Sequence, residues 1–353
     1  MTTVLCTLYN SLYLDKGLVL YDSLCKCSKD FKLYVLCMDD KCYEVLTDLH
    51  QEYHIPIKLS DFEKGDEELL KAKGNRSMAE YCWTCSSSLI RYVFNHYLEP
   101  ICTYIDADMY FYSDPQLLVE EMINSEKSVM VTPHRFPKKN ERLSQKVGIY
   151  CVEFNTFMNN SESLEVLEYW RNRCLECCSN LGDGIHWGDQ KYLEELVEKF
   201  SCVHVCQNAG AGVAPWNIIL YKMSTTYNND YLMYRELNEI IPLFFYHFQS
   251  VKYVTRQIIN TAIPTINAID FSLVDSLYYP YLCKIEVKKQ MLEEKYDVSY
   301  LITYHPSDKK NSKMRMLVNK IHPRHLLSVL RARIMNIRLY VIDISKYGSN
   351  IIS

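Results

Sequence analysis

The stretch Ile101-Cys-Thr-Tyr-Ile-Asp-Ala-Asp-Met-Tyr-Phe-Tyr112 decides the fold. Its first five residues are mostly apolar and rich in β-branched and aromatic side chains, which predicts a buried strand of a parallel sheet. Asp106 and Asp108 follow at once, where open α/β sheets bind their ligands. Ser113-Asp114-Pro115 then opens a helix with proline in its first turn. Two carboxylates fixed at a strand end are suitable ligands for Mg²⁺ or Mn²⁺, and such an ion can stabilise a departing diphosphate.

The segments around this stretch alternate between strand and helix patterns. Strands are expected at 4–9, 33–37, 55–59 and 128–132, and helices at 16–24, about 42–49 and 78–97. This βαβα order implies a mostly parallel sheet with helices on both faces, so the predicted fold class is α/β.

Past residue 150 the pattern becomes mixed. Expected here are strands at 150–158, 202–206 and 243–247, helices at 162–178 and 189–199, and a hairpin formed by 218–223 and 231–234. From about Asp270 onward the chain is expected to be mainly helical.

The composition is that of a globular protein, with 353 residues of which 48% are hydrophobic and 23% are charged. The net charge of −4 argues against bulk nucleic-acid binding. The N-terminus has no basic region ahead of an apolar core, so we expect a cytoplasmic protein whose 15 cysteines are reduced thiols. The pairs Cys82/Cys85 and Cys174/Cys177 lie in helical patterns, which favours packing over a zinc site.

Two residues near the end of the last expected strand are candidates for the site. His247 is either a half-buried histidine with a satisfied hydrogen bond or the nitrogen ligand that completes a site begun by Asp106 and Asp108. Lys252 would then meet a departing phosphate as a point charge.

Three further residues, Asp189, Trp216 and Arg91, have a structural and a functional interpretation each. Asp189 is either the N-cap of the following helix or an acidic group that reaches sugar hydroxyls. Asn155 offers an amide, Trp216 is either a stacking surface or part of the core, and Arg91 is either a phosphate contact or a solvated helix charge. The loop over 207–217 is either a turn-rich connection or a place of close backbone approach.

Taken in order, these segments resemble GT-A-fold glycosyltransferases, above all the glycogenin and galactosyltransferase-like (family 8-like) group. The likeness rests on Thr7 and Tyr9, a Ser/Arg helix before the hydrophobic strand, Asp-x-Asp at 106–108, Asn155, Gly-Asp-Gln at 188–190 and His-Phe at 247–248. The chain is also similar to uncharacterised bacterial sugar transferases with Trp-Thr-Cys, Pro-His-Arg-Phe, Gly-Asp-Gln-Lys-Tyr-Leu and Ala-Pro-Trp-Asn, here at 83–85, 133–136, 188–193 and 214–217. The resemblance covers roughly residues 3 to 252.

The resemblance implies transfer of a sugar from a nucleotide-diphosphate sugar, with a UDP-sugar favoured, to a glycan or lipid-linked hydroxyl with retention. Asp106, Asp108 and His247 would hold Mn²⁺ or Mg²⁺, and Asp106 also the ribose. Thr7, Tyr9 and Arg91 would lie near the nucleotide, and Asn155, Asp189 and Lys252 would serve catalysis. A catalytic domain is expected over 1–255, with a nucleotide-binding half at 1–135, a donor/acceptor half at 136–255 and a mainly helical extension at 256–353.

The sequence departs from the group at two places and leaves two other classes open. Asn155-Thr156-Phe157 stands where the group has Asn-Ala/Ser-Gly, and Ser250 where it has glycine. A phosphohydrolase with Asp106 as nucleophile would need a threonine shortly after Asp108, and residues 109–111 do not supply one. A non-catalytic sugar-nucleotide-binding protein would bind the donor without turnover.

The C-terminal segment is basic. Between Lys313 and Lys346 there are eight Lys or Arg residues and one acidic residue, Asp343, with apolar residues at helical spacing. Such a helix suits peripheral contact with an anionic membrane, or else it packs on the catalytic domain with its charges solvated.

Overall fold

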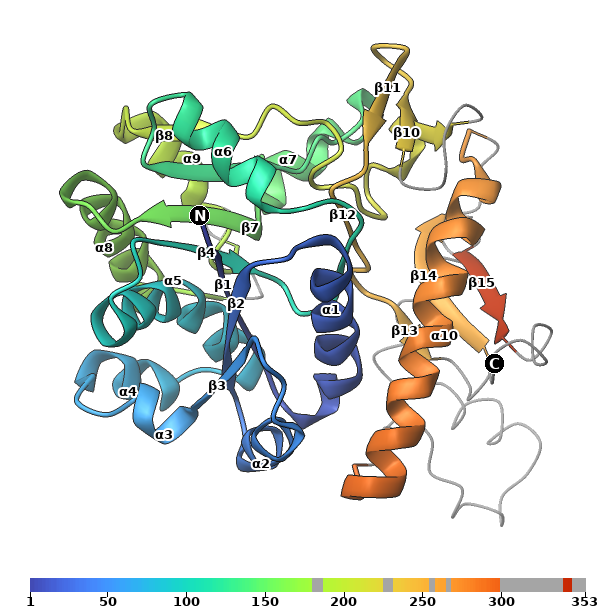
Figure 1. Ribbon diagram of the computed structural model, residues 1–353. Helices are drawn as coiled ribbons and strands as arrows, with labels where there is room; N and C mark the ends of the chain where they lie inside the picture. Colours follow the sequence, from blue (N-terminus) through green and yellow to red (C-terminus); the bar gives the residue numbers. More distant parts are fainter. Residues whose placement is uncertain (180–186, 225–230, 254–257, 265–267, 299–338, 345–353) are drawn as a thin grey trace.

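A seven-stranded sheet of order β3-β2-β1-β4-β7-β6-β8 forms the centre of the protein (Figure 1). The computed structural model describes residues 1–179, 187–224, 231–253, 258–264, 268–298 and 339–344. The strands are β1 (Thr3–Tyr9), β2 (Phe31–Cys37), β3 (His54–Lys58), β4 (Ile101–Ile105), β6 (Val129–Pro133), β7 (Tyr150–Met158) and β8 (Val203–Val205). All pairs are parallel except those of β7, which is antiparallel to β4 and β6. The predicted α/β class with a mostly parallel sheet is confirmed.

Helices cover both faces of this sheet because successive side chains of each strand point to opposite faces. Leu5 packs into a cluster with α1 (Leu14–Cys27), α2 (Asp40–Leu49) and α6 (Gln116–Asn124). Its neighbours Val4 and Cys6 pack on the other face with α5 (Met78–Tyr97), α8 (Ser161–Glu176) and α9 (Tyr192–Lys199). The short helices α3 (Leu59–Phe62), α4 (Glu67–Lys73) and α7 (Glu141–Val147) lie in the connections.

A third cluster lies beside the sheet, around α10 (Phe271–Tyr296). One small sheet is made of β9 (Tyr221–Met223), β10 (Tyr231–Tyr234) and β11 (Glu239–Pro242), another of β13 (Lys252–Tyr253), β14 (Ile258–Pro264) and β15 (Leu339–Asp343). Figure 1 shows α10 running along α1, where Lys288 forms a 2.7 Å ion pair with Asp22.

A two-stranded antiparallel pair connects the central sheet to this third cluster. β5 (Met109–Phe111) pairs with β12 (Phe245–His247), so that Met109 lies opposite His247. The amide of Phe248 also donates to the carbonyl of Asp108 at 2.8 Å. This pair brings the end of the Asp-x-Asp segment next to a histidine that is 139 positions away.

The second half of the chain differs from the sequence prediction in several places. The hairpin is found, but its first segment begins as a 3-10 turn (Ile218–Leu220), and β11 extends it to three strands. The segment after His247 contains β13, β14 and β15 besides the expected helix α10. These strands are short or irregular, so their period-2 signal is weak. Residues 299–338, which include most of the basic segment with helical spacing, lie outside the described residues, and the division at residue 255 stays a prediction.

Within the described ranges, no helix combines the length and the apolarity needed to cross a bilayer.

Candidate active site

Asp106, Asp108 and His247 meet at the edge of the central sheet. The His247 Nε2 atom lies 3.1 Å from Asp108 Oδ1 and 3.6 Å from Asp106 Oδ2. Both aspartates follow β4, and the β5–β12 pair supplies the histidine. The side chain of Asp106 is 30% exposed, whereas those of Asp108 and His247 are nearly closed off. The expected meeting of His247 with the two aspartates is confirmed, and their role as metal ligands stays a prediction.

The two aspartates differ in their electrostatics. Burial raises the pKa of Asp106 to about 6, against the opposing charge of His247. Burial would also raise the pKa of Asp108, but the charge of His247 and its hydrogen bond outweigh this and lower the value to about 2. In turn, the carboxylates around His247 hold its pKa well above the ordinary value despite burial. The surrounding carboxylates thus favour positive charge on His247.

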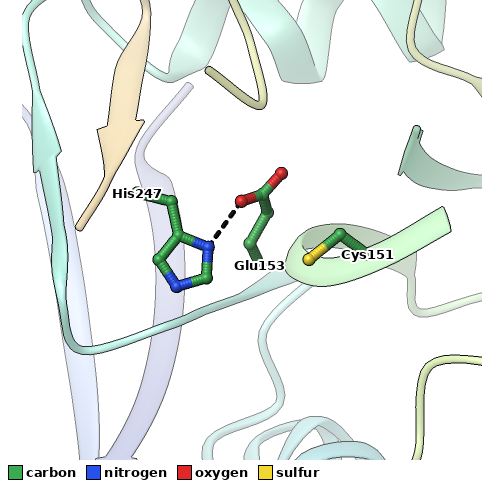
Figure 2. Close-up of side chains that lie close together, drawn as sticks. All are labelled: Cys151, Glu153 and His247. Carbon is green, nitrogen blue, oxygen red and sulfur yellow. Dashed lines mark hydrogen bonds and ion pairs between the residues drawn. The ribbon is translucent and has the colours of Figure 1, made fainter. Parts of the chain in front are cut away.

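A second group lies on the other side of the His247 ring. Figure 2 shows Glu153 and Cys151 projecting from β7 toward the imidazole. His247 Nδ1 lies 2.6 Å from Glu153 Oε2, and ligand atoms of all three residues lie within 4.8 Å of one another. Burial raises the pKa of the Cys151 thiol to about 12.

The Nε2 side fits a divalent ion better than the Nδ1 side. It offers two carboxylates and an imidazole nitrogen, the hard oxygen and borderline nitrogen donors that Mn²⁺ and Mg²⁺ accept. On the Nδ1 side the nitrogen already makes a hydrogen bond of 2.6 Å, and the thiol is protonated at neutral pH. Among the described residues, neither Cys-x-x-Cys pair belongs to a group that could hold a metal, and the cysteines are free thiols.

Lys16 lies within electrostatic range of Asp108, and Lys252 lies within electrostatic range of Lys16. Burial would lower the pKa of Lys16, but Tyr13 and the negative charges of Asp108 and Asp15 outweigh it and raise the value. Partial desolvation and the charge of Lys16 lower the pKa of Lys252. Neither forms a salt bridge with any residue that the structure describes. Cations within electrostatic range of a carboxylate site suit a ligand with several negative charges.

Asp189 lies close to the same site. It comes before α9, whose N-cap is Lys191, and its side chain does not cap that helix. Instead the Ser86 hydroxyl of α5 donates to Asp189 Oδ2 at 2.7 Å. Burial and the charge of Asp106 raise the pKa of Asp189 to about 7, although the Ser86 hydrogen bond opposes this. The N-cap interpretation is therefore wrong. Asp189 is instead a buried acid with a pKa of about 7.

The segments that carry the resemblance to bacterial sugar transferases dock on one another. Asn217 Nδ2 and Trp216 Nε1 donate to the carbonyl of His134 at 2.9 and 2.8 Å. Arg135 donates to the carbonyls of Cys206 and Ala211 at 2.8 and 2.5 Å. These contacts hold the 207–217 loop against β12, where the His247 amide donates to the carbonyl of Val213 at 2.9 Å. The loop is thus part of the site's wall.

A cavity of about 270 Å³ lies next to this wall. The Trp216 ring stands edge-on to the His247 ring at 5.5 Å and forms one side of the cavity. The other lining residues include Leu143, Ile219, Ser250, Ala262 and Ile269. Ser250 adopts a φ of +64°, a conformation that favours glycine, and this is the position where the glycogenin-like group has glycine.

The remaining candidates have these surroundings. Thr7 is buried with an unpartnered hydroxyl, and Tyr9 packs in the core with its hydroxyl 3.3 Å from His54 Nε2. Asn155 is buried in β7, where its Oδ1 accepts from the Thr132 amide at 3.4 Å and its Nδ2 has no partner. Arg91 forms a 2.5 Å ion pair with Glu168. Their roles near nucleotide and sugar stay predictions.

Three residues at the site, Glu153, Lys16 and Ser86, were not predicted from the sequence. Glu153 is the single acidic residue in the otherwise mostly apolar strand 150–158, and this was the available signal. Lys16 looks like an ordinary cation near a helix start, and Ser86 like a small residue on a packed helix face.

Fold and site together define an α/β protein with a carboxylate–histidine centre at the edge of its central sheet. No protein-family model matches the chain. It is 31% identical to "Uncharacterized protein YfnD" of Bacillus subtilis (strain 168) over 79% of this chain and 88% of that protein. It is 30% identical to "Uncharacterized protein YfnF" of the same strain over 84% of this chain and 97% of that protein. The chain belongs to the family of YfnD and YfnF.

Solved structures with similarity to this protein include glycosyltransferases. They include mouse xyloside xylosyltransferase 1 (12% identity, TM-score 0.45, 71% of this chain and 98% of that chain). The galactosyltransferase LgtC, solved with donor and acceptor sugar analogues, is 13% identical with a TM-score of 0.45 over 70% of this chain and 87% of its own. GlyE of Streptococcus pneumoniae TIGR4 is 13% identical with a TM-score of 0.45, over 89% of this chain and 67% of its own.

Proposed function

We propose that this chain is a metal-dependent glycosyltransferase. It transfers a sugar from a nucleotide-diphosphate sugar, with a UDP-sugar favoured, to a glycan or lipid-linked hydroxyl with retention of configuration. The observation that carries the proposal is the meeting of Asp106, Asp108 and His247 at the sheet edge, with Lys16 and Lys252 nearby. Carboxylates that hold an ion and cations that face a polyanion are what a nucleotide diphosphate requires.

Each residue has a defined task in this proposal. The bound Mn²⁺ or Mg²⁺ supplies positive charge that neutralises the diphosphate. Asp106, Asp108 and His247 hold that ion, and Asp106 also binds the ribose. Lys16 and Lys252 bind the diphosphate oxygens and stabilise their charge as the bond to the sugar breaks. Asp189 and Asn155 orient the donor sugar and the acceptor hydroxyl.

A screen of nucleotide sugars tests the function. In the presence of Mn²⁺, a ligand at about 100 times its dissociation constant stabilises the fold by about 2.7 kcal/mol, which a thermal-shift assay detects. We expect a UDP-sugar to give the largest shift and to release UDP when acceptors are added. A shift without turnover would favour a non-catalytic binding protein. Phosphate release from a simple phosphomonoester, without any sugar-nucleotide shift, would favour a phosphohydrolase and contradict the proposal.

The cavity beside Trp216 is the proposed acceptor site. Replacing Trp216 by alanine removes the aromatic wall, so we expect the KM for the acceptor to rise roughly tenfold, the equivalent of about 1.4 kcal/mol. Hydrolysis of the nucleotide sugar in the absence of acceptor provides the internal control and should change little. An equal loss in both reactions would place Trp216 at the donor instead.

Contact with a membrane through the basic segment at 313–346 would suit a lipid-linked acceptor. Most of this segment lies outside the described residues. Co-sedimentation with anionic vesicles, with and without neutral substitutions at Lys320, Arg324, Arg331 and Arg333, tests the contact.

A further inference from the structure

Glu153 is a carboxyl group in a place where charge is costly. It lies in the middle of β7 with none of its surface exposed. Oε2 lies 2.6 Å from His247 Nδ1, while Oε1 has no hydrogen-bond partner. Burying a charged or polar group without full compensation destabilises a fold by several kcal/mol. Packing alone therefore gives no reason for a glutamate at this position.

The neighbouring loop closes over the free oxygen of this group. A Cβ added at Gly212 would lie 3.0 Å from Glu153 Oε1, so the glycine allows the backbone to approach closely. Gly212 also has a φ of +78°, which few other residues adopt. With the loop so close, the Glu153–His247 pair is closed off from bulk water and its geometry is fixed.

The Glu153–His247 pair determines which nitrogen of His247 can bind an ion. With the imidazole as donor and the glutamate oxygen as acceptor, Nδ1 carries the proton that lies between it and Glu153 Oε2. The other nitrogen, Nε2, is the one that faces Asp108 at 3.1 Å and Asp106 at 3.6 Å. A ligand nitrogen needs a lone pair, and with Nδ1 held toward Glu153 the proton that a binding ion displaces is the one on Nε2, between the ring and the two aspartates.

We propose that Glu153 is the positioning residue of the metal centre: it fixes His247 in the Nδ1-protonated tautomer and thereby makes Nε2 the ligand beside Asp106 and Asp108. The inference rests on the proposed function only for the identity of the ion site. Histidine ligands commonly donate their second ring N–H to a carboxylate, and removal of that partner typically weakens metal binding by 10- to 100-fold.

The alternative is an ion held on the inner side by Cys151, Glu153 and His247 Nδ1 (Figure 2). Such an ion would have to break the 2.6 Å hydrogen bond and move the imidazole proton to Nε2, toward the aspartates. The inner and outer sites therefore exclude each other, and Cys151 distinguishes them experimentally.

The test measures the affinity of the full chain for Mn²⁺ alone. Binding is detected as a loss of the electron paramagnetic resonance signal of free Mn²⁺. Glu153→Gln keeps the size and an acceptor for Nδ1, and should raise the dissociation constant about tenfold. Glu153→Leu removes the acceptor and should raise it up to about 100-fold. Thermal unfolding of the metal-free variants shows whether they fold; should Glu153→Leu fail to fold, Glu153→Gln decides.

The matched control is Glu121→Gln. Glu121 forms a similar pair with His204, at 2.6 Å from Nε2, on α6 and β8. The Glu121→Gln substitution should leave Mn²⁺ affinity unchanged, and so should Cys151→Ser. Wild-type Mn²⁺ affinity in both Glu153 variants overturns the proposal. So does a loss of Mn²⁺ affinity in Cys151→Ser equal to that in Glu153→Leu. A wild-type chain that binds no Mn²⁺ also overturns it. Nucleotide-sugar turnover is measured separately: Glu153-dependent Mn²⁺ binding without turnover contradicts the proposed function and leaves this inference intact.

Discussion

Replacing Asp108 by asparagine lowers sugar turnover by about three orders of magnitude and weakens Mn²⁺ binding. Asp108 is the aspartate nearest His247 Nε2, and its pKa of about 2 keeps it ionised throughout the working range. The substitution removes one charged ligand of the ion, and the loss of about 4 kcal/mol of charge stabilisation corresponds to roughly 10³ in rate. Steady-state kinetics over a range of Mn²⁺ concentrations measure the effect.

Asp114→Asn is the matched control, because it removes one negative charge from the same segment. Asp114 Oδ1 accepts from the amide of Gln116 at 3.0 Å, and asparagine can keep that hydrogen bond. Its turnover and Mn²⁺ affinity should equal those of the wild type. Full activity of the wild type in excess EDTA, or of Asp108→Asn without added metal, would contradict a metal-dependent reaction.

Replacing Asp189 by asparagine should stabilise the fold and abolish most of the activity. The buried carboxyl has a pKa of about 7, and asparagine can accept the Ser86 hydrogen bond without bearing a charge. Each pKa unit corresponds to about 1.4 kcal/mol, so the gain in unfolding free energy has an upper limit of about 4 kcal/mol. Turnover should fall by about 100-fold while nucleotide binding is kept, because the sugar and acceptor lose their acidic partner.

The stability gain depends on pH in a defined direction. Between the ordinary aspartate pKa and about 7, the folded protein binds more protons than the unfolded chain, so the wild type loses stability as pH rises. The difference between Asp189→Asn and the wild type should therefore be small near pH 4 and largest above pH 7. Thermal unfolding in EDTA across this range measures it, and a difference independent of pH would contradict the buried charge.

The pH dependence of turnover gives a second check on Asp189. If the carboxylate form is required, turnover falls as pH drops through about 7. Ser86→Ala removes the hydrogen bond that holds this pKa down, so the fall should move to higher pH. An unchanged profile would mean that Asp189 acts only in packing.

The sequence predicted the first half of the fold well, and physical reasons explain both this and the later errors. Strands such as β1 and β4 are buried on both sides and read as apolar runs, while α5 has a capping box formed by Ser77 and Glu80. Strands β11 and β13 have four and two residues and partly exposed side chains, which leaves almost no periodic signal. Their pairing depends on distant partners that no local pattern reveals.

The site could be predicted in part. The Asp-x-Asp position followed from a strand and a turn, and the meeting with His247 followed from the resemblance rather than from any local pattern. Glu153 was missed because a strand pattern does not show which residue a buried acid will face. The N-cap interpretation of Asp189 failed because α9 begins at Tyr192 and not at residue 189.

The pairing of β5 with β12 has an energetic consequence for the centre it supports. Closing a chain segment of more than 100 residues costs on the order of 5 kcal/mol of configurational entropy, and Asp108 and His247 are 139 positions apart. Here backbone hydrogen bonds, including that from the Phe248 amide to the Asp108 carbonyl, close this segment. The ligand side chains are therefore already close together before an ion binds. No cost of ordering the chain reduces the affinity for the ion. Removal of the ion by a chelator should leave the β5–β12 pair folded, so that the Phe248 amide keeps its protection from hydrogen exchange.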